Sequence, residues 1–386
     1  MISATAGVCT ILAKNYISFA RTLFLSLQKQ HPDIRCYALI IDDWKDFLKP
    51  AGEPFEILSL SSIAVPNVIE MAFKYDLLEF STAVKPFLLE HLFVQKGFEK
   101  LLYLDPDIFV TGSLEKLFNA LDEHDFVITP HLDTDYPEDG LKPDDRQILI
   151  SGVFNLGFLG IRKSQTSESF LKWWQQKLKT KCIIDPARGY CVDQRFIDLA
   201  IILFPNFYIE RDTGYNVAYW NLHSRYLSFE QNTWKCNGGP LYFFHFSAYK
   251  LEQPSLISYH TNRFSLEDRP DLKSLFNEYR RHLMENGYME TYQWPYSFGT
   301  FADGTNITYE MRSHYRTAVA KGMQVSDPFQ PRKDLAENIA WDGKVHCLVS
   351  LLKNLARSLT PPVSWKGFKW INYSFGNTRN SEKPKA

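Results

Sequence analysis

A short acidic motif at the end of an apolar segment constrains this chain more than any other feature. The apolar run 101–104 leads directly into Asp105-Pro106-Asp107. Because proline has no amide proton for a sheet ladder, the strand predicted over 101–104 should end there and hand both carboxylates to a loop. Ligands of open α/β sheets bind outside the carboxyl ends of the strands, so the two acids are placed to hold a divalent cation. A solvated turn is the alternative for two acids at this spacing.

The ligand chemistry indicates which cation such a pair would take. Carboxylate oxygens are hard ligands that suit magnesium or manganese, and these ions commonly keep open positions for the phosphates of a substrate. A diphosphate would therefore complete the coordination.

Apolar segments of alternating period predict an α/β fold. The β-rich segment 8–12 precedes apolar residues at helical spacing over 19–27, and a second apolar segment follows at 36–41. Pro86 starts a further predicted helix, 86–94, ahead of the acidic motif. Alternation of strand and helix predicts a mostly parallel central sheet flanked by helices.

Length and charge limit the organisation and the partners. The chain has 386 residues, 45% of them hydrophobic, and we expect a catalytic domain over 1–262, a helical appendage over 263–376 and a disordered tail over 377–386. The 43 Lys and Arg against 44 Asp and Glu give a net charge of -1, which offers no electrostatic case for a nucleic-acid partner.

The chain's ends and cysteines predict a cytoplasmic protein. Met1 is followed by no export signal, and no apolar run approaches the roughly 20 residues that span a bilayer. The six cysteines lack metal-ligand spacing and read as reduced thiols, with pairing of Cys182 and Cys191 as a minor alternative.

The C-terminal region combines basic and aromatic residues, among them Trp365, Lys366, Lys369 and Trp370. That composition predicts peripheral contact with the inner face of a membrane. A basic appendage packed on the catalytic domain is the alternative.

Three polar segments have no clear period. The acidic segment 133–145 is either a lid or a solvated insert, and we expect it to be mobile. The segments 211–221 and 296–304 are rich in hydrogen-bonding and aromatic groups. Each either builds a pocket or is an ordered loop.

Further motifs join the acidic pair, and with them the chain resembles a known family over roughly residues 8–250. They are the entry segment Thr10 to Leu27, Ala83-Val84-Lys85-Pro86, Tyr103-Leu104-Asp105-Pro106-Asp107, Phe154-Asn155-Leu156-Gly157, Val192-Asp193-Gln194 and Phe244-His245-Phe246-Ser247. In order and spacing the chain resembles the nucleotide-sugar glycosyltransferases of the GT-A (Rossmann-like) fold, particularly the glycogenin-like and bacterial lipopolysaccharide galactosyltransferase-like retaining family.

The resemblance implies a metal site and a donor site. It makes His245 the third metal ligand beside Asp105 and Asp107, although a lone histidine in an aromatic strand is usually a core residue. By resemblance, the residues that would bind the nucleotide-sugar donor are Thr10, Ile11, Ala13, Tyr16, Lys85, Tyr103 and Asp105. Tyr16 would stack on the base or belong to the core, and Lys85 would meet phosphate or sugar oxygens or be a solvated lysine.

The resemblance also implies a reaction centre. Asn155, Asp193 and Gln194 match positions that line the donor sugar, where Asp193 would accept hydrogen bonds from hydroxyls and Gln194 would stabilise positive charge at the anomeric carbon. Either would otherwise hold the loop. Ser247 and Ala248 stand where the family has a glycine, which puts Lys250 in doubt as a phosphate clamp.

We therefore expect a metal-dependent hexosyltransferase that uses Mn²⁺ or Mg²⁺ and a nucleoside-diphosphate sugar, with UDP favoured over GDP. Its acceptor would be a glycan, a lipid-linked glycan or a protein, in polysaccharide biosynthesis, and retention is implied by the resemblance alone. The alternatives are a sugar nucleotidyltransferase, disfavoured because no Gly-rich phosphate loop follows the first strand, and a decayed transferase fold that binds carbohydrate or acts as a scaffold.

Overall fold

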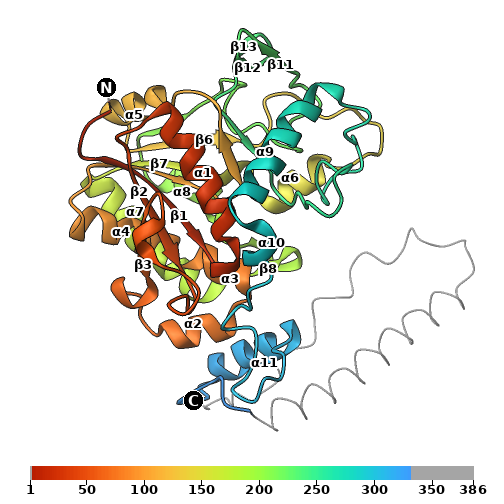
Figure 1. Ribbon diagram of the computed structural model, residues 1–386. Coiled ribbons are helices and arrows are strands. Elements are labelled where there is room, and N and C mark those ends of the chain that lie inside the picture. Colours follow the sequence, from red (N-terminus) through yellow and green to blue (C-terminus); the bar gives the residue numbers. More distant parts are fainter. Residues whose placement is uncertain (1, 332–386) are drawn as a thin grey trace, which may run out of the picture. The chain divides into compact units, whose positions relative to one another are not determined.

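A seven-stranded sheet organises the protein, and its strand order places the acidic motif near the middle (Figure 1). The computed structural model describes residues 2–331. Across the sheet the strands are β10 (Phe207–Ile209), β6 (Phe126–Pro130), β7 (Phe154–Arg162), β4 (Lys100–Leu104), β1 (Ala6–Leu12), β2 (Arg35–Ile40) and β3 (Glu56–Ser59). Only β7 runs antiparallel to its neighbours β4 and β6. The predicted α/β class with a mostly parallel sheet is confirmed.

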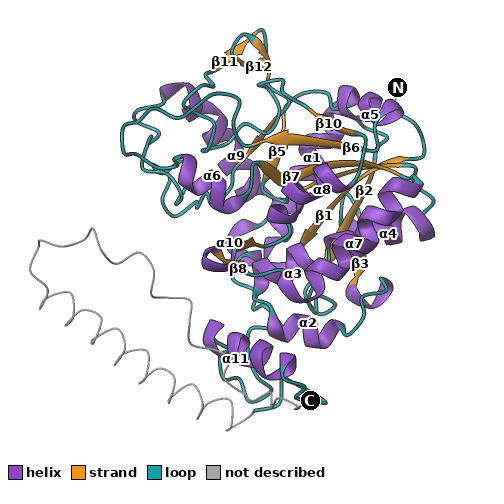
Figure 2. Ribbon diagram, turned by 180° about the vertical axis from the view of Figure 1, so that it is seen from behind, coloured by secondary structure: helices purple, strands orange, loops and turns teal. Residues whose placement is uncertain are grey.

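Helices cover both faces of this sheet. The face in front in Figure 1 is covered by α1 (Ile17–Gln30) and α5 (Glu115–Glu123), whose apolar residues pack on Val8 and Leu102. The opposite face, nearer the viewer in Figure 2, carries α2 (Val68–Lys74), α3 (Leu77–Ala83), α4 (Lys85–Gln95), α7 (Gln165–Lys181) and α8 (Ile197–Leu203). Side chains alternate along β1, so Cys9 and Ile11 face this second core.

A third apolar cluster lies beyond the sheet. It joins the short pair β5 (Ile108–Val110) and β14 (Phe243–His245) to α9 (Lys273–Glu285) and α10 (Tyr288–Thr291). The remaining elements are α6 (Asp145–Ser151), α11 (Tyr309–Ala320), a small sheet of β11 (Leu227–Glu230), β12 (Thr233–Cys236) and β13 (Gly239–Pro240), and the pair β8 (Ile184–Asp185) with β9 (Tyr190–Cys191).

The helices predicted within 263–376 begin with α9, α10 and α11, and Arg312 of α11 donates to the carbonyls of Ala72 and Tyr75. The boundary at residue 262 stays a prediction. The C-terminal basic region and the tail 377–386 lie outside the described residues. Over residues 2–331 no helix is long and apolar enough to cross a membrane. All five cysteines in that range, including Cys182 and Cys191, are free thiols.

Candidate metal centre

The acidic pair lies in the turn that follows β4. The Asp105 amide donates to the Gly157 carbonyl at 2.7 Å, and the Ile108 amide donates to the Asp105 carbonyl at 3.1 Å. β4 therefore ends at Leu104, next to the acids, and both carboxylates lie at its carboxyl end with side chains 31% and 21% exposed. The strand and loop placement predicted from Pro106 is confirmed.

His245 is brought to this turn by the antiparallel pairing of β14 with β5, in which His245 lies opposite Ile108. Its Nε2 is 3.1 Å from Asp107 Oδ1 and 3.8 Å from Asp105 Oδ2. One ligand atom from each of the three residues lies within 4.8 Å of the other two. Two carboxylates and an imidazole at this spacing fit a small divalent cation such as Mn²⁺ or Mg²⁺.

Gly157 makes room for the imidazole. A β-carbon at Gly157 would overlap His245 Cε1 and would lie 2.7 Å from Nδ1. The side chain of His245 is only 4% exposed, so the ring is enclosed by protein. The glycine of the segment 154–157 therefore leaves the space that the ring occupies next to the acidic pair.

Lys85, the first residue of α4, is buried beneath the acids. Its ammonium forms an ion pair with Asp193 at 2.6 Å, donates to the Leu156 carbonyl at 2.9 Å and lies 4.2 Å from the centre of the Tyr103 ring. The Tyr103 hydroxyl donates to Asp105 Oδ1 at 2.7 Å. The alternative of a solvated lysine is therefore wrong, while contact between Lys85 and phosphate stays a prediction.

Burial and charge act against each other in this cluster. Burial raises the pKa of Asp105, and the Lys85 and His245 charges oppose that rise. Burial likewise raises the pKa of Asp193 against the effect of Lys85. For His245, burial alone would lower the pKa, but the Asp107 and Asp105 carboxylates outweigh it and raise the pKa. The two carboxylates thus favour positive charge at the point where they meet His245.

Asn155, the second residue of β7, lies beside Gln194. Gln194 Oε1 accepts from the Leu156 amide at 3.0 Å and from Asn155 Nδ2 at 3.3 Å, and its Nε2 donates to the Ser151 carbonyl at 2.9 Å. These bonds tie the loop that carries Gln194 to β7 and to Ser151, which agrees with the alternative that Gln194 has a structural role. Its role at a reacting carbon stays a prediction.

The residues predicted to bind the nucleotide do not share one face. Ile11 and Ala13 belong to the same core as Tyr103, whereas Thr10 alternates with them and faces α1 together with Leu12. Thr10 is fully buried, and its hydroxyl has no hydrogen-bond partner. Strand alternation therefore separates the Thr10 side chain from that of Ile11.

Tyr16 lies between the metal centre and an aromatic cluster. Its ring stacks on Phe19 at a centroid distance of 4.5 Å and lies 5.8 Å from Tyr292. Burial raises its pKa, with further contributions from Tyr292 and from the Asp107 carboxylate. These ring contacts are those of a packed core residue, and stacking of Tyr16 on a base stays a prediction.

Lys14 and Asp42, at the ends of β1 and β2, form a buried ion pair of 2.8 Å that the sequence interpretation missed. Lys14 Nζ also donates to Ser297 Oγ at 2.8 Å, which ties the segment 296–304 to this edge of the sheet. Lys250 is exposed instead, with its ammonium 4.4 Å from the Tyr259 ring centre.

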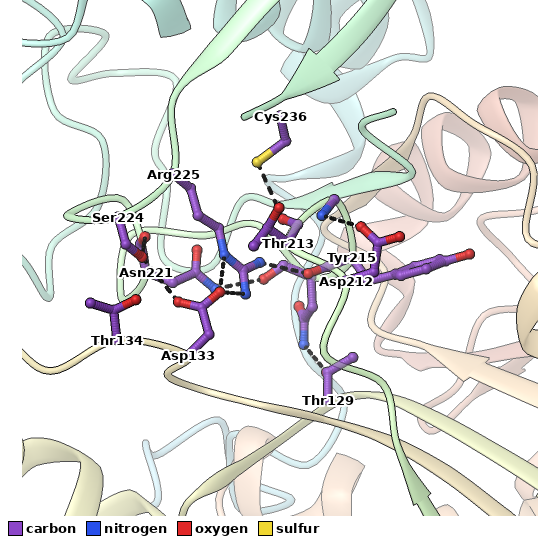
Figure 3. A network of polar contacts seen from close by, with 12 residues as sticks. Thr129, Asp133, Thr134, Asp212, Thr213, Tyr215, Asn221, Ser224, Arg225 and Cys236 are labelled. Carbon is purple, nitrogen blue, oxygen red and sulfur yellow. Dashed lines mark hydrogen bonds and ion pairs between the residues drawn. The ribbon is translucent and has the colours of Figure 1, made fainter. Parts of the chain in front are cut away.

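The acidic segment 133–145 is held at several points. Asp133 forms an ion pair of 3.0 Å with Arg225, and Figure 3 shows this guanidinium between Asp133 and the Tyr215 backbone. The Tyr136 hydroxyl donates to the Trp220 carbonyl at 2.6 Å, and Arg263 pairs with Asp139 at 2.6 Å. These contacts favour an ordered insert over the mobile loop expected from composition.

Comparison with known proteins identifies similar chains. No family model matches this sequence. The uncharacterized protein YfnF of Bacillus subtilis (strain 168) is 23% identical over 286 residues, which cover 73% of this chain and 94% of that protein.

Two solved glycosyltransferase structures are also similar. The galactosyltransferase LgtC, solved with donor and acceptor sugar analogs, is 15% identical to this chain with a TM-score of 0.42. The match covers 71% of this chain and 95% of the LgtC chain. GlyE of Streptococcus pneumoniae TIGR4 is 17% identical to this chain with a TM-score of 0.42. The match covers 77% of this chain and 66% of the GlyE chain.

Proposed function

We propose that this protein is a metal-dependent glycosyltransferase that moves a hexose from a nucleoside-diphosphate sugar to a glycan, lipid-linked glycan or protein acceptor. The convergence of Asp105, Asp107 and His245 carries the proposal. A turn after a central strand and a residue 138 positions further along the chain meet at the edge where α/β proteins bind ligands. The motif resemblance supports a UDP-sugar donor and retention of configuration.

The chemistry that we propose follows from the three metal ligands. A divalent cation held by these three residues would neutralise charge on a departing diphosphate, so no proton donor to that leaving group is needed. Tyr103 orients Asp105 through a 2.7 Å hydrogen bond, and Lys85 adds a buried positive charge beneath it. Asn155, Asp193 and Gln194 lie beside Lys85 and Leu156, where they would contact the sugar.

Calorimetric titration with UDP, with and without Mn²⁺, tests the proposal before either the sugar or the acceptor is known. Binding that requires Mn²⁺ supports a transferase and justifies a screen of UDP-sugars for hydrolysis and transfer. Should folded protein bind neither UDP nor GDP under either condition, the transferase proposal fails and a carbohydrate-binding role takes its place. Release of pyrophosphate from UTP and a sugar phosphate would instead indicate nucleotidyl transfer.

A further inference from the structure

We propose that Asn216 is a positioning residue: its side-chain oxygen accepts a hydrogen bond from Nδ1 of His245, which turns Nε2 toward Asp105 and Asp107, where a bound cation would lie. The inference rests on the metal centre of the proposed function. It assigns a role to one residue of the polar segment 211–221, in which the sequence singled out no position.

The argument starts from a backbone amide. The Gly157 N–H lies 3.1 Å from a terminal side-chain atom of Asn155. A backbone N–H can only donate, so that atom must be the amide oxygen, Oδ1. The orientation of the Asn155 amide therefore follows from the main chain of β7.

Asn155 in turn sets the orientation of Asn216. The Asn216 atom that lies 3.0 Å from Asn155 Oδ1 must be a donor, which makes it Nδ2, and the same nitrogen donates to Thr129 Oγ1 at 2.8 Å. Both hydrogens of this nitrogen are then used. The oxygen of Asn216 is left to face His245 Nδ1 at 3.3 Å.

A carbonyl oxygen only accepts, so His245 Nδ1 must carry a hydrogen. In the neutral imidazole the lone pair is then on Nε2, the nitrogen that lies 3.1 Å from Asp107 and 3.8 Å from Asp105. Histidines that bind metals almost always donate their other ring N–H to a neighbouring acceptor. Mutation of such an acceptor typically lowers metal affinity by about 10–100-fold.

Asn216 is itself held rigidly. It is 1% exposed, and its φ of 52° lies in the left-handed region that asparagine tolerates better than most residues. Its carbonyl accepts from Asn221 Nδ2 at 3.0 Å. Arg225 anchors the preceding carbonyl, that of Tyr215, at 2.7 Å while paired with Asp133 (Figure 3).

The tautomer can be measured in the unaltered, metal-free protein. We would record proton–nitrogen correlations of protein labelled with ¹⁵N-histidine, which report separately whether Nδ1 and Nε2 carry a hydrogen. A His245→Gln variant identifies the His245 signals among the ten histidines. The inference expects a hydrogen on Nδ1, with or without a second one on Nε2, and a His245 protonated on Nε2 alone would overturn it, whether or not the protein binds a metal.

A pair of variants tests the consequence for metal binding. Asn216→Gly keeps the left-handed backbone and removes the acceptor, so Mn²⁺ affinity measured by electron paramagnetic resonance should fall by about 10–100-fold. Thr129→Val removes the other contact of Asn216 Nδ2 and leaves the oxygen beside His245, so its affinity should stay near that of the wild type.

Wild-type affinity in folded Asn216→Gly, or an equal loss in Thr129→Val, would overturn the inference. If Asn216→Gly does not fold, the tautomer of the wild-type protein decides alone. If wild-type protein binds no Mn²⁺, the proposed function fails, and the tautomer measurement still tests the orientation of His245.

Discussion

The imidazole of His245 occupies the volume that a β-carbon on Gly157 would fill. We predict that Gly157→Ala displaces the ring and weakens Mn²⁺ binding at least about tenfold, because the third ligand leaves its place above the acids. Overpacking a buried site should also cost about 1–3 kcal/mol of unfolding free energy. Mn²⁺ titration and urea unfolding of the same variant measure the two effects.

Gly160→Ala is the matched control for this prediction. Its β-carbon would meet Val127 and Leu102, at 3.0 and 3.3 Å, and not His245. We expect lower stability with unchanged Mn²⁺ affinity. Equal losses of affinity in the two variants would show that strand distortion, and not the His245 contact, is responsible.

The buried pair of Lys85 and Asp193 gives a second prediction. Lys85→Met should lower the free energy of unfolding by about 3–5 kcal/mol, because it leaves the Asp193 carboxylate buried without its cation. Lys85→Met combined with Asp193→Asn should regain a large part of that loss. A double-mutant cycle by urea unfolding checks this, and additive single effects would contradict the pairing.

A third prediction concerns the pH dependence of stability. Burial would raise the pKa of Asp133, but the Arg225 charge and the Ser224 hydrogen bond outweigh it and lower the pKa. A lowered aspartate pKa gives stability that is present above the ordinary value near about 4 and is lost as pH falls below it. The stability difference between wild type and Asp133→Asn, measured by urea unfolding, should therefore shrink as the pH is lowered from about 6 to about 3. A difference that stays constant would exclude the pair as its source.

Sequence reasoning predicted well those features of the site that depend on residues adjacent in the chain. Pro106 ends β4 and exposes the acids whatever the rest of the fold does. Lys85 and Asp193 were both singled out, but their ion pair joins residues 108 positions apart, and no spacing rule relates them. Their contact depends on how α4 packs beneath the sheet.

Strand alternation and side-chain hydrogen bonding explain the other differences. The family resemblance places both Thr10 and Ile11 at the nucleotide, yet adjacent residues of β1 face opposite cores. Asn216 left no sequence signal beyond a polar segment, because its role depends on the oriented amide of Asn155. A left-handed asparagine is a property of the folded turn and is not evident from composition.

The most direct test of the central claim is Mn²⁺ binding by Asp107→Ala compared with wild type. Asp107 is partly exposed and lies in a turn, so the variant should fold with little loss of stability, as thermal unfolding would verify. The account predicts that wild-type protein binds Mn²⁺ and UDP together and that Asp107→Ala loses the Mn²⁺-dependent binding. Retention of that binding in the folded variant would contradict the assignment of Asp105, Asp107 and His245 as the metal centre.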